Sequence, residues 1–316
     1  MQRRTFCLIA GAGIAFGQSK SRGIEDFFRD FTDEWVANDP MSATENHYFT
    51  GAAQDKLERR LAPPTAAESR KRVALARKGL RELRTLDRAA MTPTQALAAG
   101  VMDWQLDIAA AEEPYLDYWF PFEQMNGWNV GVLEHFTVGR SMATIRDAEN
   151  YVAALEQVGP RTEQAISESK RLERKGTIPP RFILQATLKQ MYGFIDGPAA
   201  SNPFVTSLAQ KMTGIFDISA ARREELRSAA EKIVDTKIYP AWKKAIAALE
   251  GQLAKSTDDA GLWRLKGGRE AYAYFLKRYT TTDLTAEEIH QIGLDRVAEI
   301  EEQMDELLKR LGRTEG

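Results

Sequence analysis

Apolar residues recur at every third or fourth position through most of this chain, and that spacing is typical of amphipathic α-helices. Proline, glycine and asparagine punctuate the periodic segments, as expected for turns between helices. The alternation of apolar and polar residues that marks a β-strand is visible only weakly, at residues 129–132. The pattern therefore predicts an all-α protein, a multi-helix array of roughly ten to twelve helices, several of them long.

The best-defined helix is predicted near the carboxyl end, where apolar side chains from Ile289 to Leu311 line one face over roughly seven turns. Thr285 and Glu288 have the spacing of a capping box, in which each side chain bonds to the backbone N–H of the other residue. Gly312 can adopt the left-handed conformation that ends a helix. These local signals fix the start and the end of this helix.

Composition is that of a globular protein with a sizeable core. The 316 residues are 43% hydrophobic and 28% charged, with a formal net charge of −2. Such a charge gives no general attraction to nucleic acid or to an anionic membrane. The basic run between Ala66 and Leu86 carries apolar residues at helical spacing, so we interpret it as a solvated helix face. Neither a nucleic-acid partner nor a membrane span beyond the export signal is expected.

The first 17 residues have the features of an export signal. Arg3 and Arg4 precede a short, glycine-containing apolar stretch that ends at the small residues of Ala15–Gly17. The paired arginines indicate a twin-arginine signal, with a general secretory signal as the alternative. We therefore expect residues 18–316 to form a single helical domain in the periplasm or outside the cell. The lone cysteine, Cys7, excludes an internal disulfide framework.

Residues 112–136 form an aromatic, proline- and glycine-punctuated segment with weak helical periodicity. Such a segment can line a substrate groove, with polar contacts from side chains such as Gln124. It can equally fill a gap between helical layers. Gln124 and Trp128, together with Tyr279 farther along the chain, are our candidates for substrate contact.

No catalytic or metal-binding group is predicted in this chain. A zinc peptidase needs two histidines four residues apart on one helix, with an adjacent glutamate. The three histidines, His47, His135 and His290, are far apart in sequence, so the H-E-x-x-H motif is absent. Glu287-x-x-His290 would suit a di-iron site only with a second copy, which the sequence lacks. We expect no catalytic residue, no metal ligand and no cofactor within these residues.

One long stretch resembles a known family. The similarity runs without gaps through the carboxyl-terminal quarter, with shorter matches upstream at Pro121 and Gln124, at 148–151, and at Gly176 and 179–181. It resembles the bacterial domain of unknown function 885 family, whose members resemble largely helical, zinc-dependent metallopeptidases. The main matching residues are Gly261–Leu265, Gly267, Gly268, Tyr272–Tyr274, and Arg278–His290 with Gly293 and Leu294.

The resemblance implies a zincin-like helical scaffold and peptide-bond hydrolysis by a zinc-bound water, with a peptide as substrate. In that family the zinc motif follows the segment matched at Thr280–Leu294. We therefore expect the chain to be the amino-terminal portion of a longer family domain, inactive alone, with zinc bound only by the full-length protein. Apolar surface meant for the remainder should then be exposed. The alternative is a non-catalytic, extracytoplasmic helical binding or scaffold protein that uses residues 115–136 as its contact surface.

Overall fold

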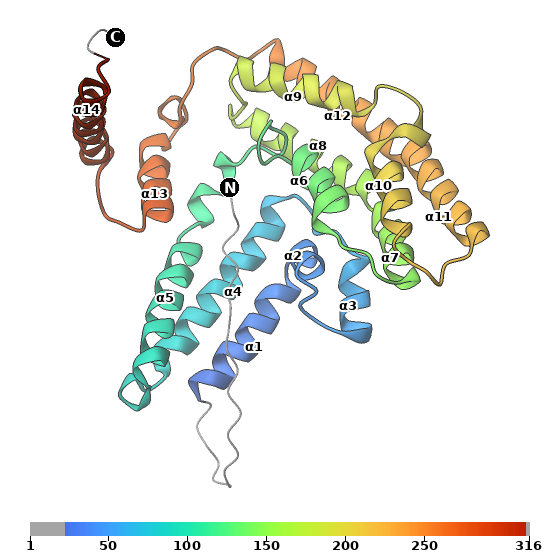
Figure 1. The fold of residues 1–316 in the computed structure, drawn as a ribbon, viewed down its shortest axis with the longest axis horizontal. Coiled ribbons are helices and arrows are strands. Elements are labelled where there is room, and N and C mark those ends of the chain that lie inside the picture. Colours follow the sequence, from blue (N-terminus) through green and yellow to red (C-terminus); the bar gives the residue numbers. More distant parts are fainter. Residues whose placement is uncertain (1–22, 314–316) are drawn as a thin grey trace.

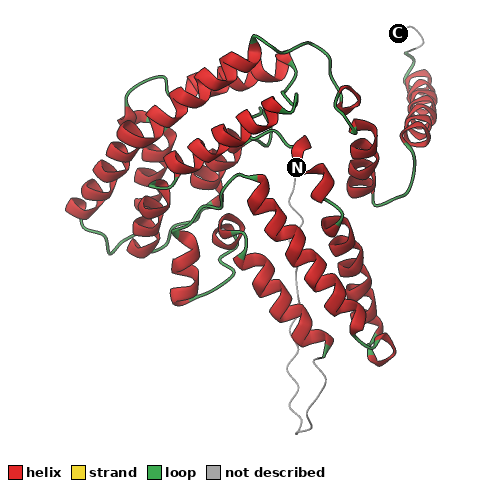
Figure 2. Ribbon diagram, turned by 180° about the vertical axis from the view of Figure 1, so that it is seen from behind, coloured by secondary structure: helices red, strands yellow, loops and turns green. Residues whose placement is uncertain are grey.

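A computed structural model of the protein describes residues 23–313, so the predicted export signal lies outside the described residues. Within this range the chain forms α-helices and short 3-10 and π turns without any β-strand, which confirms the all-α prediction (Figure 2). The weak strand signal at residues 129–132 was wrong, because these residues lie in a helix. The helices are α1 (Ile24–Ala37), α2 (Pro40–Glu45), α3 (Gly51–Glu58), α4 (Ala66–Thr85), α5 (Pro93–Ala110), α6 (Trp128–Glu134), α7 (Ile145–Leu155), α8 (Val158–Arg174), α9 (Arg181–Phe194), α10 (Pro203–Met212), α11 (Ala220–Ile233), α12 (Tyr239–Leu253), α13 (Gly268–Thr280) and α14 (Ala286–Arg310).

The first bundle is built from α1, α4 and α5, which lie side by side in Figure 1. Phe27 and Phe31 of α1 stack at 5.6 Å and pack with apolar side chains of α4 and α5. Gly79 leaves room for this contact, because a Cβ there would lie 2.1 Å from the Phe31 ring. On the outside, Arg84 of α4 pairs with Asp103 of α5 at 2.9 Å. These contacts hold α4 and α5 together as neighbouring helices.

The second, larger bundle contains α6 to α12 around one continuous core. Tyr151, Phe204 and Trp242 are among its fully buried side chains. The Tyr151 hydroxyl donates to the Phe204 carbonyl at 2.8 Å, so its polar atom is satisfied inside the core.

Two prolines lie near the starts of helices, where they do little harm. The chain breaks between the end of α7 at Leu155 and the start of α8 at Val158, so Pro160 lies in the first turn of α8, where a missing N–H removes no helical hydrogen bond. Pro240 follows a π-helical turn at Val234–Ile238 that joins α11 to α12.

The last two helices, α13 and α14, lie at one edge of the molecule in both views (Figures 1 and 2). α13 contacts the segment between α5 and α6, whereas α14 stands beyond α13 and buries no residue. None of the helices between residues 23 and 313 combines the length and the apolar character needed to cross a lipid bilayer.

Candidate functional site

The Gly267-Gly268 pair makes the turn that starts α13. Gly267 has a φ of 72°, and the backbone carbonyl of the preceding residue, Lys266, accepts a hydrogen bond from the Tyr118 hydroxyl at 2.5 Å. Gly268 is pressed against the preceding turn, because a Cβ there would lie 1.7 Å from the Leu262 carbonyl oxygen. Only glycine fits both requirements, so this pair fixes where α13 leaves the body of the protein.

Aromatic side chains hold α13 in place. Tyr115 stacks on Tyr274 with ring centroids 4.5 Å apart, and Trp119 meets Phe275 edge-on at 5.3 Å. The Tyr274 hydroxyl donates to the Ile108 carbonyl at 2.9 Å. The first half of the aromatic segment at residues 115–136 is therefore used to dock α13.

The second half of that segment is core. Phe122, Trp128 and Phe136 are buried among the helices of the larger bundle. Of the two readings of the segment, the structure thus favours the one in which it fills the gap between helical layers. Trp119 and Met125 are the apolar side chains of the segment that remain exposed.

The three residues predicted to contact substrate lie in three different elements. Trp128 is 8% exposed, and its ring N–H donates to the Thr162 hydroxyl at 2.9 Å. Tyr279 is 65% exposed and lies at the end of α13. Gln124 is partly buried in the loop before α6. A substrate role for these residues stays a prediction.

The surroundings of Gln124 contain two unpaired acceptors. Gln190 of α9 bridges the loop, since its amide donates to the Gln124 carbonyl at 3.1 Å and its own oxygen lies 3.5 Å from Asn129 Nδ2. The side-chain oxygens Gln124 Oε1 and Asn129 Oδ1 are buried and have no hydrogen-bond partner among the described residues. Buried acceptors of this kind are normally satisfied, so these two oxygens lack the donor that a buried acceptor usually has.

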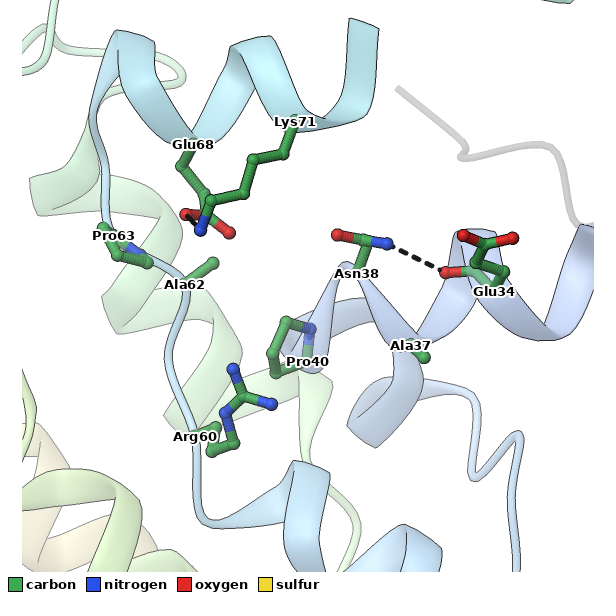
Figure 3. A pocket seen from close by; sticks show the side chains of 9 residues that line it. All are labelled: Glu34, Ala37, Asn38, Pro40, Arg60, Ala62, Pro63, Glu68 and Lys71. Carbon is green, nitrogen blue, oxygen red and sulfur yellow. Dashed lines mark hydrogen bonds and ion pairs between the residues drawn. The ribbon is translucent and has the colours of Figure 1, made fainter. Parts of the chain in front are cut away.

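Two concave regions on the surface are polar and contain none of the three predicted residues. One, of about 240 Å³, lies between the end of α1 and the start of α4 (Figure 3). In it Lys71 pairs with Glu68 at 2.6 Å, and Asn38 donates to the Glu34 carbonyl at 3.1 Å. The other, of about 430 Å³, is an open hollow lined by Lys170, Glu173, Arg174 and Lys255. Neither has the apolar lining typical of a peptide cleft.

A buried polar cluster joins residues that are far apart in sequence. The Glu58 side chain is 4% exposed, and its two oxygens accept from Gln54 and Asn150 at 2.9 Å each. Arg140 donates to the Glu58 carbonyl at 2.9 Å and lies 5.6 Å from the Phe136 ring. This cluster links α3 to the segment after α6 and to α7.

Two of the three histidines belong to the same region. His47, with a φ of 43°, has one ring nitrogen hydrogen-bonded to the Ser141 hydroxyl and the other 3.7 Å from Glu58 Oε1. Ser141, His47 and Glu58 are the residue types of a nucleophilic triad, but the 3.7 Å between His47 and Glu58 is longer than the hydrogen bond that would orient the imidazole. The arrangement therefore fits a structural contact between segments better than an activated nucleophile. Sequence spacing gave no signal for it, since these residues belong to separate segments.

Burial governs the electrostatics of this cluster. Desolvation lowers the pKa of the Arg140 guanidinium to about 10, which the Glu58 carboxylate opposes. It also lowers the pKa of His135, whose Nδ1 lies 3.0 Å from Glu45 Oε1. His135 Nε2 is buried and unpaired among the described residues, so this imidazole is best accommodated in the neutral form.

No set of three or more His, Cys, Asp or Glu side chains within residues 23–313 is arranged to hold a metal ion. The described residues therefore do not fit a zinc site. His290 lies on α14, away from His47 and His135 of the buried cluster.

α14 presents an apolar surface that none of the residues from 23 to 313 covers. Its capping box is confirmed, with Glu288 N–H donating to Thr285 Oγ1 at 3.2 Å and Thr285 N–H to Glu288 Oε2 at 2.7 Å. Gly312 adopts the predicted left-handed conformation at the other end, with a φ of 72°. The apolar face of α14, with side chains between 38% and 74% exposed, consists of Val297, Ile300, Met304, Leu307, Leu308 and Leu311.

Covering this face would stabilise the protein considerably. Six half-exposed apolar side chains correspond to roughly 6 kcal/mol of gross hydrophobic free energy, at about 1 kcal/mol each. Contiguous apolar patches of this kind mark interaction surfaces. The predicted exposure of apolar surface is confirmed at α14.

The described residues thus form an all-α array whose last helix leaves its apolar face exposed. The chain belongs to the bacterial domain of unknown function 885 (DUF885) family, whose sequence pattern matches residues 40–316. None of the functionally curated proteins is significantly similar to it in sequence.

A solved structure has the same fold. It is the crystal structure of "the putative lipoprotein from Colwellia psychrerythraea", which is 20% identical and superposes with a TM-score of 0.81. The match covers 92% of this chain but 52% of that protein. The chain therefore spans about half the length of this structural relative.

Proposed function

We propose that residues 18–316 are the amino-terminal helical part of an exported, zinc-dependent hydrolase that cleaves peptide bonds, and that this part is inactive alone. The observation that carries the proposal is the uncovered apolar face of α14, in a chain that spans half of its structural relative. Export is supported by the charged and apolar pattern of residues 1–17 and by the description of the relative as a lipoprotein.

In this proposal the chain contributes to the wall of the substrate channel. The unpaired oxygens of Gln124 and Asn129 would accept hydrogen bonds from the backbone N–H groups of a peptide. Tyr279 would supply an exposed aromatic surface at the end of α13. Trp128 would act from the core, by holding the start of α6 in position through its bond to Thr162. The zinc ligands would come from the part of the longer protein that this chain does not span.

The test compares the 316-residue chain with a longer polypeptide read from the same gene. Both are purified, their zinc content is measured by mass spectrometry, and both are assayed against a library of short peptides. We expect one zinc ion per longer chain together with hydrolysis, and neither property in the 316-residue chain. Stoichiometric zinc in the 316-residue chain, or a longer chain without zinc, would refute the proposal.

A non-catalytic binding or scaffold protein is the second candidate. It is favoured by the exposure of Trp119 and Met125 on the aromatic segment. In that case the longer polypeptide binds peptides without cleaving them, and Met125→Ser weakens that binding. The two functions are thus separated by whether product appears.

A further inference from the structure

We propose that the apolar face of α14 binds a helical segment whose own apolar face is flanked by lysine or arginine side chains. The inference rests on the proposed function in one respect, since that segment is taken to belong to the part of the longer protein that this chain does not span. It goes further by naming the chemistry of the partner.

The geometry of α14 calls for a helical partner. Val297, Ile300, Met304, Leu307 and Leu311 follow one another at steps of three and four, which is the spacing of a helix-packing seam. Leu308 widens the seam beyond a two-helix coiled coil, so the face has the breadth of a helix inside a bundle. A flat, straight surface of this kind on a 25-residue helix fits other helices best.

The negative charge of α14 favours a positively charged partner. The helix carries eight acidic and three basic residues, a formal net charge of −5, whereas the whole chain is −2. Glu301 and Asp305 lie along one edge of the apolar face, and they form no ion pair with any described residue. Arg296, on the other edge, is already paired with Glu299 of the same helix. A partner with lysine or arginine opposite Glu301 and Asp305 is therefore complementary.

The same charge disfavours two other occupants. A second copy of α14 would place two helices of charge −5 side by side, which costs free energy through like-charge repulsion. An anionic membrane surface would be repelled for the same reason, since interfacial helices that bind such membranes are rich in lysine and arginine.

The experiment uses the 316-residue protein and two synthetic helical peptides of the length of α14. Both peptides carry the same leucine seam, one flanked by lysine and the other by glutamate, and their binding is measured by fluorescence anisotropy. We expect the lysine peptide to bind at least about tenfold more tightly than the glutamate peptide, with an affinity that falls as salt is raised. Charge reversal by Glu301→Lys with Asp305→Lys should invert the preference.

Variants in the seam provide the internal control. Ile300→Ser with Leu307→Ser should abolish binding of both peptides, and the fold should survive because α14 buries no residue. Phe216→Ser removes an equally apolar side chain that is 96% exposed elsewhere, and it should leave binding unchanged. Circular dichroism verifies that each variant is folded.

Three results would overturn the inference: equal affinity for the two peptides, binding that survives the Ile300→Ser and Leu307→Ser changes, or seam-dependent dimers in sedimentation. Seam-dependent binding to anionic vesicles would overturn it as well. The assay is independent of zinc and hydrolysis. Failure of the proposed function therefore leaves the peptide result standing, and a failed peptide result leaves the zinc measurement unaffected.

Discussion

The buried cluster around Glu58 and Arg140 allows a quantitative test of what joins the front of the chain to the larger bundle. The Arg140 side chain is enclosed between the Phe136 and Tyr151 rings, 5.6 Å from each, and donates to the Glu58 carbonyl. Replacing Arg140 with methionine keeps the apolar stem but removes the hydrogen bond to the Glu58 carbonyl and the positive charge that acts on the Glu58 carboxylate. Loss of such a charged, buried hydrogen-bond donor costs about 1.5–3 kcal/mol in unfolding free energy.

The partner substitution, Glu58→Gln, should cost about 2–3 kcal/mol, because the new amide N–H₂ faces the donor groups of Gln54 or Asn150. The double variant should be less destabilised than the sum of the single variants by about 1–2 kcal/mol, since it buries neither charge alone. Urea denaturation followed by circular dichroism gives the free energies of all four proteins.

A surface pair provides the reference for this cycle. Lys277 and Asp283 lie 2.8 Å apart, with the Asp283 side chain 86% exposed. Exposed pairs contribute little, so the same cycle on Lys277→Met and Asp283→Asn should give a coupling close to zero. If the Arg140–Glu58 coupling is no larger than that of the surface pair, the buried charges do not act together and the reasoning fails.

Three further substitutions test other contacts. Hydrogen bonds from Arg171 and Lys175 lower the pKa of Asp117 to about 2. Asp117→Asn should therefore cost about 2 kcal/mol of unfolding free energy at pH 7. Urea titrations should show this difference from wild type disappearing as the pH falls from about 4 to 2. Burial lowers the pKa of His135, so the wild type should lose stability as the pH falls below about 6.5, and thermal melts of His135→Gln should show a smaller loss. Gly268→Ala should release α13 and cost at least about 2 kcal/mol, because its Cβ would lie 1.7 Å from the Leu262 carbonyl, and limited proteolysis after α12 would detect this release.

Each of these three predictions has an outcome that would contradict it. An Asp117→Asn protein whose stability stays below that of wild type at pH 2 would show that its contribution is not ionic. For the histidine, a His135→Gln protein that loses as much stability as wild type when the pH falls below about 6.5 would contradict the prediction. If the Gly268→Ala protein resists proteolysis as well as wild type does, α13 tolerates the added Cβ and is not released.

Local structure was largely predictable from the sequence, because its signals act between neighbouring residues. The Thr285–Glu288 box and the Gly312 stop both form as their spacing indicates. Each depends on hydrogen bonds within one turn of helix, so no distant contact is needed to determine it. The helix count was underestimated, since short elements such as α2 have too few residues to show a period.

The contacts that make up the candidate site were not predictable in this way. His47 meets Ser141 across 94 residues, and Arg140 meets the Glu58 carbonyl across 82. Such pairs depend on how α3 packs against α7, which no periodicity in either helix specifies. The aromatic segment shows the same limit, because its composition fits a groove and a gap filler equally. Burial separated these two readings.

The aromatic segment holds α13, and the described residues leave the apolar face of α14 exposed. Tyr115 and Trp119 contact Tyr274 and Phe275 of α13. Attraction by charge within the chain adds little at α14. Residues outside α14 carry a formal net charge of +3, but interactions between exposed charges are screened beyond about 8 Å at physiological salt. Burial of its apolar face would hold α14 more firmly, and this is the contribution that the proposed helical partner would make.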